Sequence, residues 1–356
     1  MNQPKAETHS SPATPGRWPN SGILWFALKT LIALGMLYAL YRWGFLSWSG
    51  LRLTERSPML LTFSALLIFA TIPLAAWRWK ILLSCQGLAI GYQKIFSLFY
   101  ASHFFSLFLP GGVGGDAVRV LYVCRVFPKR RTASVLSVLM DRLLGFHGLA
   151  SLAFIGVVLN QGTILGSPAL KLLAAMVSAV FAGGFALAAC LPLVSRYRRL
   201  FHAWAERRGG RVTGLLDRLL EALAIYHGHA PQIALGWFIS ILIHTSAIAG
   251  LLILALSMNF GRENLGQFSL AAPVALLANI LPLTPGGLGV GEAVFSQVSA
   301  MLAPALAALP YASLLLAHRV FSTLVALPGL LCYIGQRKFA GETPRENQCG
   351  MPGGSS

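Results

Sequence analysis

Residues 110–118 read PGGVGGDAV, and residues 285–294 read PGGLGVGEAV. With one inserted residue allowed, both stretches follow the pattern PGGxG, then an acidic residue, then Ala-Val. Each motif interrupts an apolar region, because proline and glycine break helices and allow the backbone to turn sharply. The two motifs therefore predict two broken helices, each with its break inside an apolar region.

The composition around these motifs is that of a membrane protein. The chain has 356 residues, of which 56% are hydrophobic and only 11% are charged, whereas soluble domains are about 25% charged. The apolar runs are continuous rather than alternating, which predicts helices rather than a β-barrel. This composition excludes a soluble enzyme. The net charge of +17 indicates cytoplasmic loops and anionic headgroups, not nucleic acid.

Six segments reach the ~20 residues that a helix needs to cross a bilayer. They are Ile23–Phe45, Pro58–Trp77, Val135–Leu159, Ala169–Val194, Pro231–Met258 and Ala305–Gly335. The two motif-bearing regions, 95–123 and 268–303, would each divide into halves of roughly 12–16 residues, which are short for a span. We therefore predict an all-α polytopic membrane protein with six transmembrane helices and two re-entrant helical hairpins. Two short full spans in place of each hairpin are the alternative.

The distribution of basic residues predicts the orientation of these segments. Basic residues cluster in 1–20, 78–94, 119–131, 195–218 and 337–345, and such clusters face the cytoplasm. The loops at 46–57, 160–168, 259–267 and 304–310 carry few positive charges. Both ends of 95–123 should then lie inside and both ends of 268–303 outside, and both chain termini should be cytoplasmic.

The order span, span, hairpin, span occurs twice along the chain. Asp116 and Arg142 are 26 residues apart, and Glu292 and Arg319 are 27 apart. Each copy has three full spans, so the second copy should be inverted with respect to the first. Inverted repeats with broken helices form the substrate site of many secondary transporters. We therefore predict an inverted 4+4 repeat.

One transmembrane domain should occupy residues 21–336. Its repeat A covers about 21–160 and its repeat B about 168–336, between polar, disordered tails at 1–20 and 337–356. Within the long loop, residues about 200–226 carry leucines at helical spacing and should form an amphipathic cytoplasmic helix. This helix could lie on the membrane surface or pack on the protein itself.

Charged residues inside apolar helices need a partner or a function. Arg142 and Arg319 suit a phosphate headgroup, because a guanidinium group binds phosphate through two hydrogen bonds. Asp116 and Glu292 could bind a cationic headgroup, hold an arginine or accept a proton. Alternatively, they only cap the half-helices and pair with Arg119, Arg142 or Arg319.

The glycines of the two motifs leave backbone amides that suit a lipid phosphate, or they only allow close helix packing. The substrate-binding candidates are Arg142, Arg319, Asp116, Glu292, Arg119, Gly112, Gly114, Gly287 and Gly289. Asp141 and His318 are candidates for proton coupling. The other apolar-context histidines, His103, His147 and His244, are more typical of hydrogen-bonded core positions.

Together the motifs resemble the flippase-like membrane domain of bacterial lysylphosphatidylglycerol synthases. The matching stretches are 104–119, 141–145 and 283–293, with Arg319 in the last helix. The resemblance covers about 20–335 and implies a domain that moves a lipid between leaflets of the bacterial cytoplasmic membrane. The sequence shows no counterpart of the aminoacyl-transfer domain of those synthases, so synthesis of lysyl-lipid is not expected.

The expected function is therefore translocation of a phospholipid or related polar lipid. The chain has no nucleotide-binding or hydrolase motif, so we expect neither ATP-driven transport nor a cofactor or metal. Its five cysteines show no spacing for a zinc site or a disulfide framework. Two alternatives are a membrane enzyme that acts on lipid headgroups and a non-transporting scaffold that binds an enzyme of lipid or glycan synthesis.

Overall fold

The computed structural model describes residues 57–108, 114–208, 220, 224–258, 260–261, 265–280, 284, 287–306 and 309–332, with isolated positions between 31 and 42. Every regular element within these residues is a helix, which confirms the expected all-α fold. The helices are α2 Pro58–Cys85, α3 Tyr92–Phe108, α4 Gly114–Val126, η4 Pro128–Arg130, α5 Arg131–Leu159, α6 Gln161–Leu165, α7 Pro168–Arg208, α9 Ala230–Ser257, α10 Phe268–Ala278, α11 Val290–Leu302, η7 Pro304–Leu306 and α12 Tyr311–Ala326.

Five helical segments are long and apolar enough to cross a membrane. They are Pro58–Cys85, Pro128–Leu159, Pro168–Cys190, Ala230–Ser257 and Tyr311–Cys332. These five correspond to five of the six expected spans, so the chain is a multi-pass membrane protein. Most of the sixth, Ile23–Phe45, lies outside the described residues, as do Gly112 of the first motif, both tails and most of the expected amphipathic helix.

Several of the expected span boundaries differ from the helices in the structure, and three of these differences are large. Helix α2 continues beyond Trp77 and ends at Cys85. Gly87, two residues later, has a positive φ of 68°, which permits the turn that follows the helix. Helix α7 continues beyond Val194 to Arg208, into the expected loop. Helix α12 begins at Tyr311 rather than at Ala305, because prolines at 304 and 310 interrupt helical hydrogen bonding there.

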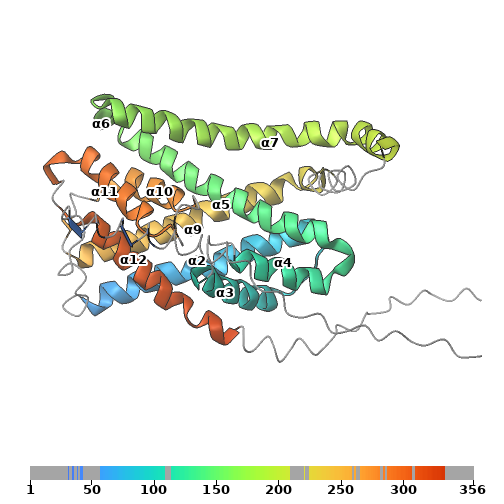
Figure 1. Ribbon diagram of the computed structural model, residues 1–356, viewed down its shortest axis with the longest axis horizontal. Coiled ribbons are helices and arrows are strands. Elements are labelled where there is room, and N and C mark those ends of the chain that lie inside the picture. The colour runs from blue at the N-terminus through green and yellow to red at the C-terminus, as the bar shows by residue number, and fades with distance from the viewer. Residues whose placement is uncertain are drawn as a thin grey trace, which may run out of the picture.

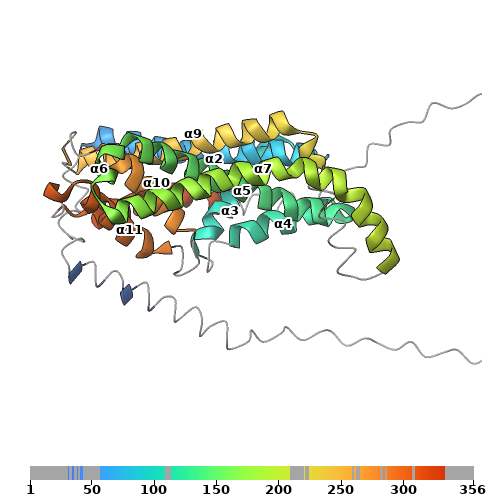
Figure 2. The same cartoon turned by 90° about the horizontal axis from the view of Figure 1, so that it is seen from above.

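The long helices run roughly parallel to the long axis of the molecule and connect its two ends (Figure 1). Helices α2 and α9 lie side by side at the centre, and α5 packs against α9 (Figures 1 and 2). Helix α7 packs on the outside against α5. Its Leu172, Met176 and Leu187 are exposed, as expected for a face that contacts lipid.

Small residues bring the central helices into close contact. Gly148 of α5 packs directly on Ser240 of α9, and Gly156 of α5 packs on the backbone of α10 at Ser269. Ser64 of α2 donates a hydrogen bond of 2.8 Å to the carbonyl oxygen of Gly250 in α9. Such positions let helix backbones approach closely, which is how helices associate in a bilayer.

Four of the shorter helices form two helical hairpins, which we call hairpin A (α3 and α4) and hairpin B (α10 and α11). In each hairpin the two helices pack against each other. Hairpin A lies toward the end of the bundle where α2 ends and α5 begins, and hairpin B lies toward the opposite end (Figure 1). At 1.5 Å per residue their helices are about 17–26 Å long, which is less than the ~30 Å of hydrocarbon in a bilayer.

Candidate functional site

Glycine contacts determine the shape of hairpin A. Gly115 of α4 packs against Ser102 and Ser106 of α3, where a Cβ atom would collide with the Ser102 carbonyl oxygen and the Ser106 hydroxyl. The Ser106 hydroxyl itself donates to the Ser102 carbonyl oxygen at 3.1 Å. The close approach places the next residue, Asp116, in the first turn of α4 at the hairpin interior, where it is buried.

Hairpin B is built in the same way at the corresponding position. Gly291 of α11 packs against the side chain of Asn279, just after the end of α10. The chain between the helices turns through Gly287 and Gly289, whose φ angles are 71° and 86°. Residues other than glycine rarely adopt such φ angles. The next residue, Glu292, is fully buried and accepts a 2.8 Å hydrogen bond from the backbone amide of Gly289.

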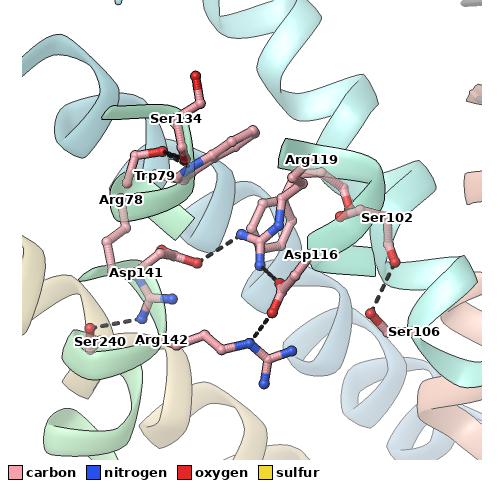
Figure 3. A network of polar contacts seen from close by, with 12 residues as sticks. Arg78, Trp79, Ser102, Ser106, Asp116, Arg119, Ser134, Asp141, Arg142 and Ser240 are labelled. Carbon is pink, nitrogen blue, oxygen red and sulfur yellow. Dashed lines mark hydrogen bonds and ion pairs between the residues drawn. The ribbon is translucent and has the colours of Figure 1, made fainter. Parts of the chain in front are cut away.

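Hairpin A takes part in a chain of five charged residues that we call network A: Arg78 of α2, Asp116 and Arg119 of α4, and Asp141 and Arg142 of α5 (Figure 3). Asp141 accepts hydrogen bonds from Arg78 Nε at 2.7 Å and from Arg119 Nη1 at 2.8 Å. Asp116 accepts from Arg119 Nη2 and from Arg142 Nε. Network A therefore joins the central helix α2, hairpin A and helix α5.

Network A also contacts polar and aromatic groups beyond its ion pairs. Arg78 Nη1 donates a 2.8 Å hydrogen bond to the Ser240 hydroxyl of α9. The Arg119 guanidinium lies 5.2 Å from the ring centroid of Trp79 and 4.8 Å from that of Phe99. Cations are stabilised over aromatic faces, which partly compensates for the loss of water around the buried Arg119.

Hairpin B carries a smaller set of contacts that we call pair B, Glu292 and Arg319. Arg319 Nε donates to Glu292 Oε1 at 3.0 Å. Arg319 Nη2 donates to the Asn279 side-chain oxygen and to the Gly287 carbonyl oxygen, each at 3.4 Å. A cavity of about 150 Å³ opens beside pair B and is lined by Leu276, Asn279, Leu315, His318, Arg319 and Ser322.

Two of the histidines donate hydrogen bonds to backbone carbonyl groups as expected for structural positions, whereas neither ring nitrogen of His147 has a hydrogen-bond partner within the described part of the chain. His318 Nε2 contacts the Ala247 carbonyl oxygen at 3.2 Å, and His244 Nε2 contacts the Gly145 carbonyl oxygen at 2.9 Å. His147 stacks between the rings of Phe181 and Trp237. No group of three potential metal-binding side chains occurs among the described residues. Of the four histidines, His318 is the one that lines the cavity beside Arg319.

The structure brings the charged candidate residues together in two groups, one at each hairpin. Both acidic residues pair with arginines, which is compatible with either interpretation of the sequence. Gly287 and Gly289 form the turn of hairpin B, whereas Gly114 begins α4. Gly115, Gly287 and Gly291 all pack closely on neighbouring atoms, and Gly115 and Gly291 directly precede Asp116 and Glu292.

Sequence reasoning also missed Arg78, Ser240 and Asn279. Arg78 was assigned to a cytoplasmic basic loop, but α2 continues past it and buries it to 6% exposure beside Asp141. Asp141 was the available signal, because a carboxylate within an apolar span requires a cation from another helix. The sequence contains no comparable signal for Asn279 or Ser240.

These features define a polytopic helical membrane protein with charged sites inside its helical bundle. The chain matches the family described as "Lysylphosphatidylglycerol synthase TM region" over residues 26–329, which is most of its length. The chain belongs to this family, whose members are membrane-embedded and linked to lipid metabolism. No curated protein and no solved structure matches the chain.

Proposed function

We propose that this protein moves a phospholipid or related polar lipid between the leaflets of the bacterial cytoplasmic membrane, without covalent change and without ATP. The observation that carries the proposal is the recurrence of one arginine–carboxylate pair at each hairpin, Arg142 with Asp116 and Arg319 with Glu292. A lipid headgroup does not cross hydrocarbon unaided, because burial of its unpaired charges is very costly. Arginines inside the bundle lower that cost by binding the phosphate.

In this proposal the hairpins are re-entrant, and the two halves of the chain form an inverted repeat. The proposal is supported by the short helices of both hairpins and by their positions toward opposite ends of the bundle. The termini and the end of the bundle that carries η4 face the cytoplasm, because the basic residues gather there. Each hairpin then presents its arginine to headgroups that arrive from its own side of the membrane.

The carboxylates hold the arginines while no headgroup is bound. When a phosphate reaches Arg142 or Arg319, it competes with Asp116 or Glu292 for the same guanidinium nitrogens. The acyl chains of the translocated lipid remain in the bilayer during the whole movement. Protonation of a released carboxylate, of Asp141 or of His318 beside the cavity would favour the conformation that is open to one side of the membrane. A pH gradient would therefore alter the rate of lipid translocation.

The test is reconstitution of the purified protein in liposomes that carry an acyl-labelled phospholipid in one leaflet and contain no nucleotide. We expect a protein-dependent loss of leaflet asymmetry that weakens in Arg142→Ala. If no membrane lipid changes leaflet faster than in empty liposomes, the translocation proposal fails. Changed headgroup chemistry would instead support the enzyme alternative. Normal function in cells whose protein lacks both Arg142 and Arg319 would support the alternative of a scaffold for a lipid- or glycan-synthesis enzyme.

A further inference from the structure

We propose that a second lipid site lies between the end of α2 and the start of α9, where a cavity of about 420 Å³ binds the phosphate group of an anionic phospholipid from the cytoplasmic leaflet. The proposal takes the orientation of the bundle from the proposed function, but it does not depend on lipid translocation. The lipid at this site is a bound neighbour of the bundle, and the hairpins remain the sites assigned to the translocated lipid.

The cavity has apolar walls and a small number of polar side chains. Its volume lies within the range of roughly 300–1,000 Å³ that is typical of small-molecule sites. A few polar groups on apolar walls are also typical of such sites. The lining residues include Trp77, Lys80, Ile81 and Ser84 of α2 and His229 and Gln232 at the start of α9.

Lys80 brings a positive charge to the cavity, and no carboxylate among the described side chains contacts it. The described carboxylates are Asp116, Asp141 and Glu292, and each of them contacts an arginine of network A or pair B. The Lys80 ammonium group instead lies 6.0 Å from the ring centroid of Tyr92. Because a ring contact does not use the three N–H groups of the ammonium as hydrogen-bond donors, they can bind an anion.

The other polar side chains of the cavity match an anion with several acceptor oxygens. The Ser84 hydroxyl donates to the Lys80 carbonyl oxygen at 3.0 Å, and His229 Nδ1 contacts the Ile225 carbonyl oxygen at 2.8 Å, so both side chains are held in place. Gln232 is exposed, and its side-chain amide group supplies two further N–H donors. A phosphate group combines the negative charge that Lys80 attracts with oxygens for these donors.

The position of the cavity along the bundle identifies a lipid as the source of the phosphate. Lys80 lies five residues before the end of α2, which is about 8 Å along the helix. Trp77 is 43% exposed and Tyr92 is 37% exposed, and such aromatic side chains gather at the level of the headgroups. Arg130 of the basic helix η4 donates a 2.9 Å hydrogen bond to the Gln86 carbonyl oxygen at the same end of the bundle. Basic sites between helices on the cytoplasmic side bind anionic headgroups.

The cavity opens at the surface of the bundle and is separate from network A. Trp77, Ile81 and Ser84 recur at i, i+4, i+7 spacing and therefore share one face of α2. Arg78 points from another face of the same helix to Asp141. Since Trp77 and Ser84 are exposed, a lipid beside α2 reaches the cavity without passing network A.

The first experiment is photo-cross-linking of the purified full-length protein in detergent. The probes are phosphatidylglycerol and phosphatidylcholine that carry the same photoreactive group at the start of one acyl chain. Mass spectrometry identifies the labelled peptides. We expect phosphatidylglycerol to label the peptides that contain residues 77–85 and 229–232 at least about tenfold more than phosphatidylcholine does. Equal labelling of these peptides by the two lipids would overturn the proposal.

Two pairs of variants test whether the cavity itself selects the anionic lipid. Lys80→Gln should lose the preference for phosphatidylglycerol, whereas Lys94→Gln, which removes the same charge from an exposed position of α3, should retain it. Gln232→Glu should repel the phosphate, and Gln93→Glu in α3 is its exposed control. Equal losses in a variant and its control would show that the charge of the whole end matters, and the site would be rejected. The Gln232 pair gives this answer even if Lys80→Gln does not fold.

Two further arms of the cross-linking experiment identify the source of the phosphate and separate this site from the proposed function. A large molar excess of inorganic phosphate should leave the labelling in place, because the acyl chains hold the headgroup at the cavity. Displacement by phosphate at the concentration of the lipid would assign the cavity to a soluble phosphate and reject a lipid site. Arg142→Ala should keep the labelling. Preferential labelling of a protein that moves no lipid would refute translocation alone, and translocation without preferential labelling would refute this site alone.

Discussion

Arg319 Nε lies 3.0 Å from Glu292 Oε1, and the pair joins helix α12 to the first turn of α11. The same relationship exists at the other hairpin, where Arg142 of α5 contacts Asp116 in the first turn of α4. In both pairs the acid follows a closely packed glycine: Gly115 packs on α3, and Gly291 packs on Asn279 directly after α10. The two hairpins therefore share one construction, although they lie toward opposite ends of the bundle.

Removal of either arginine side chain should reduce lipid translocation. Arg142→Ala and Arg319→Ala each lose a charge-assisted hydrogen bond to the headgroup, so we expect initial rates to fall by about ten- to a hundredfold. Arg→Lys should restore only part of the rate, because an ammonium group cannot reproduce the two-pronged geometry. The measurement is the liposome assay, with membrane content of folded protein as the control. Full activity of the double Arg→Ala variant would refute a headgroup role.

Loss of Asp141 should destabilise the protein more than loss of Asp116. In Asp141→Asn, Arg78 and Arg119 both lose their shared buried carboxylate, which should cost about 3–5 kcal/mol of folding free energy. In Asp116→Asn, Arg119 keeps Asp141 and Arg142 is partly exposed, so the cost should be smaller. Thermal unfolding in detergent measures both variants. Equal unfolding temperatures would show that Asp141 does not anchor network A.

Methyl groups at the two packing glycines should disturb the hairpins. Gly115→Ala would push α4 away from Ser102, and Gly291→Ala would collide with Asn279. Each should destabilise the protein by about 1–3 kcal/mol and reduce transport, because overpacking shifts the backbone. Gly162→Ala in α6 is the control, since its methyl group would enter open space. Similar unfolding temperatures for all three variants would rule out close packing at Gly115 and Gly291.

Labelling of single cysteines in a cysteine-free background tests the orientation of the chain. Cysteines at Lys129 and Arg207 should react only from the cytoplasmic side, and cysteines at Gly162 and Asn264 only from outside. Lys129 in η4 and Gly162 in α6 lie at opposite ends of the bundle, so the pair reports on helix α5 directly. If Arg207 were labelled from outside, the proposed topology and the inverted repeat would both be wrong.

The sequence alone was sufficient to predict the class of protein and to single out several residues of the candidate site. Continuous apolar runs predicted the spans, because a helix must be about 20 residues long to cross a bilayer. The two glycine motifs predicted the positions of the hairpins, because a proline followed by several closely spaced glycines favours a break in a helix. Asp116, Asp141, Arg142, Glu292 and Arg319 were recognisable because a charge in an apolar helix is conspicuous.

Only the tertiary structure decided how these charges are paired. Arg78 looked like a loop residue at the end of a span, but α2 continues and packs beside α9, which brings Arg78 to Asp141 and Ser240. Asn279 became a partner of Arg319 through the turn of hairpin B. Helical periodicity specifies which residues share a face of one helix. Which faces meet, and at which height along the bundle, depends on contacts between distant segments, such as Gly148 on Ser240, that no local pattern encodes.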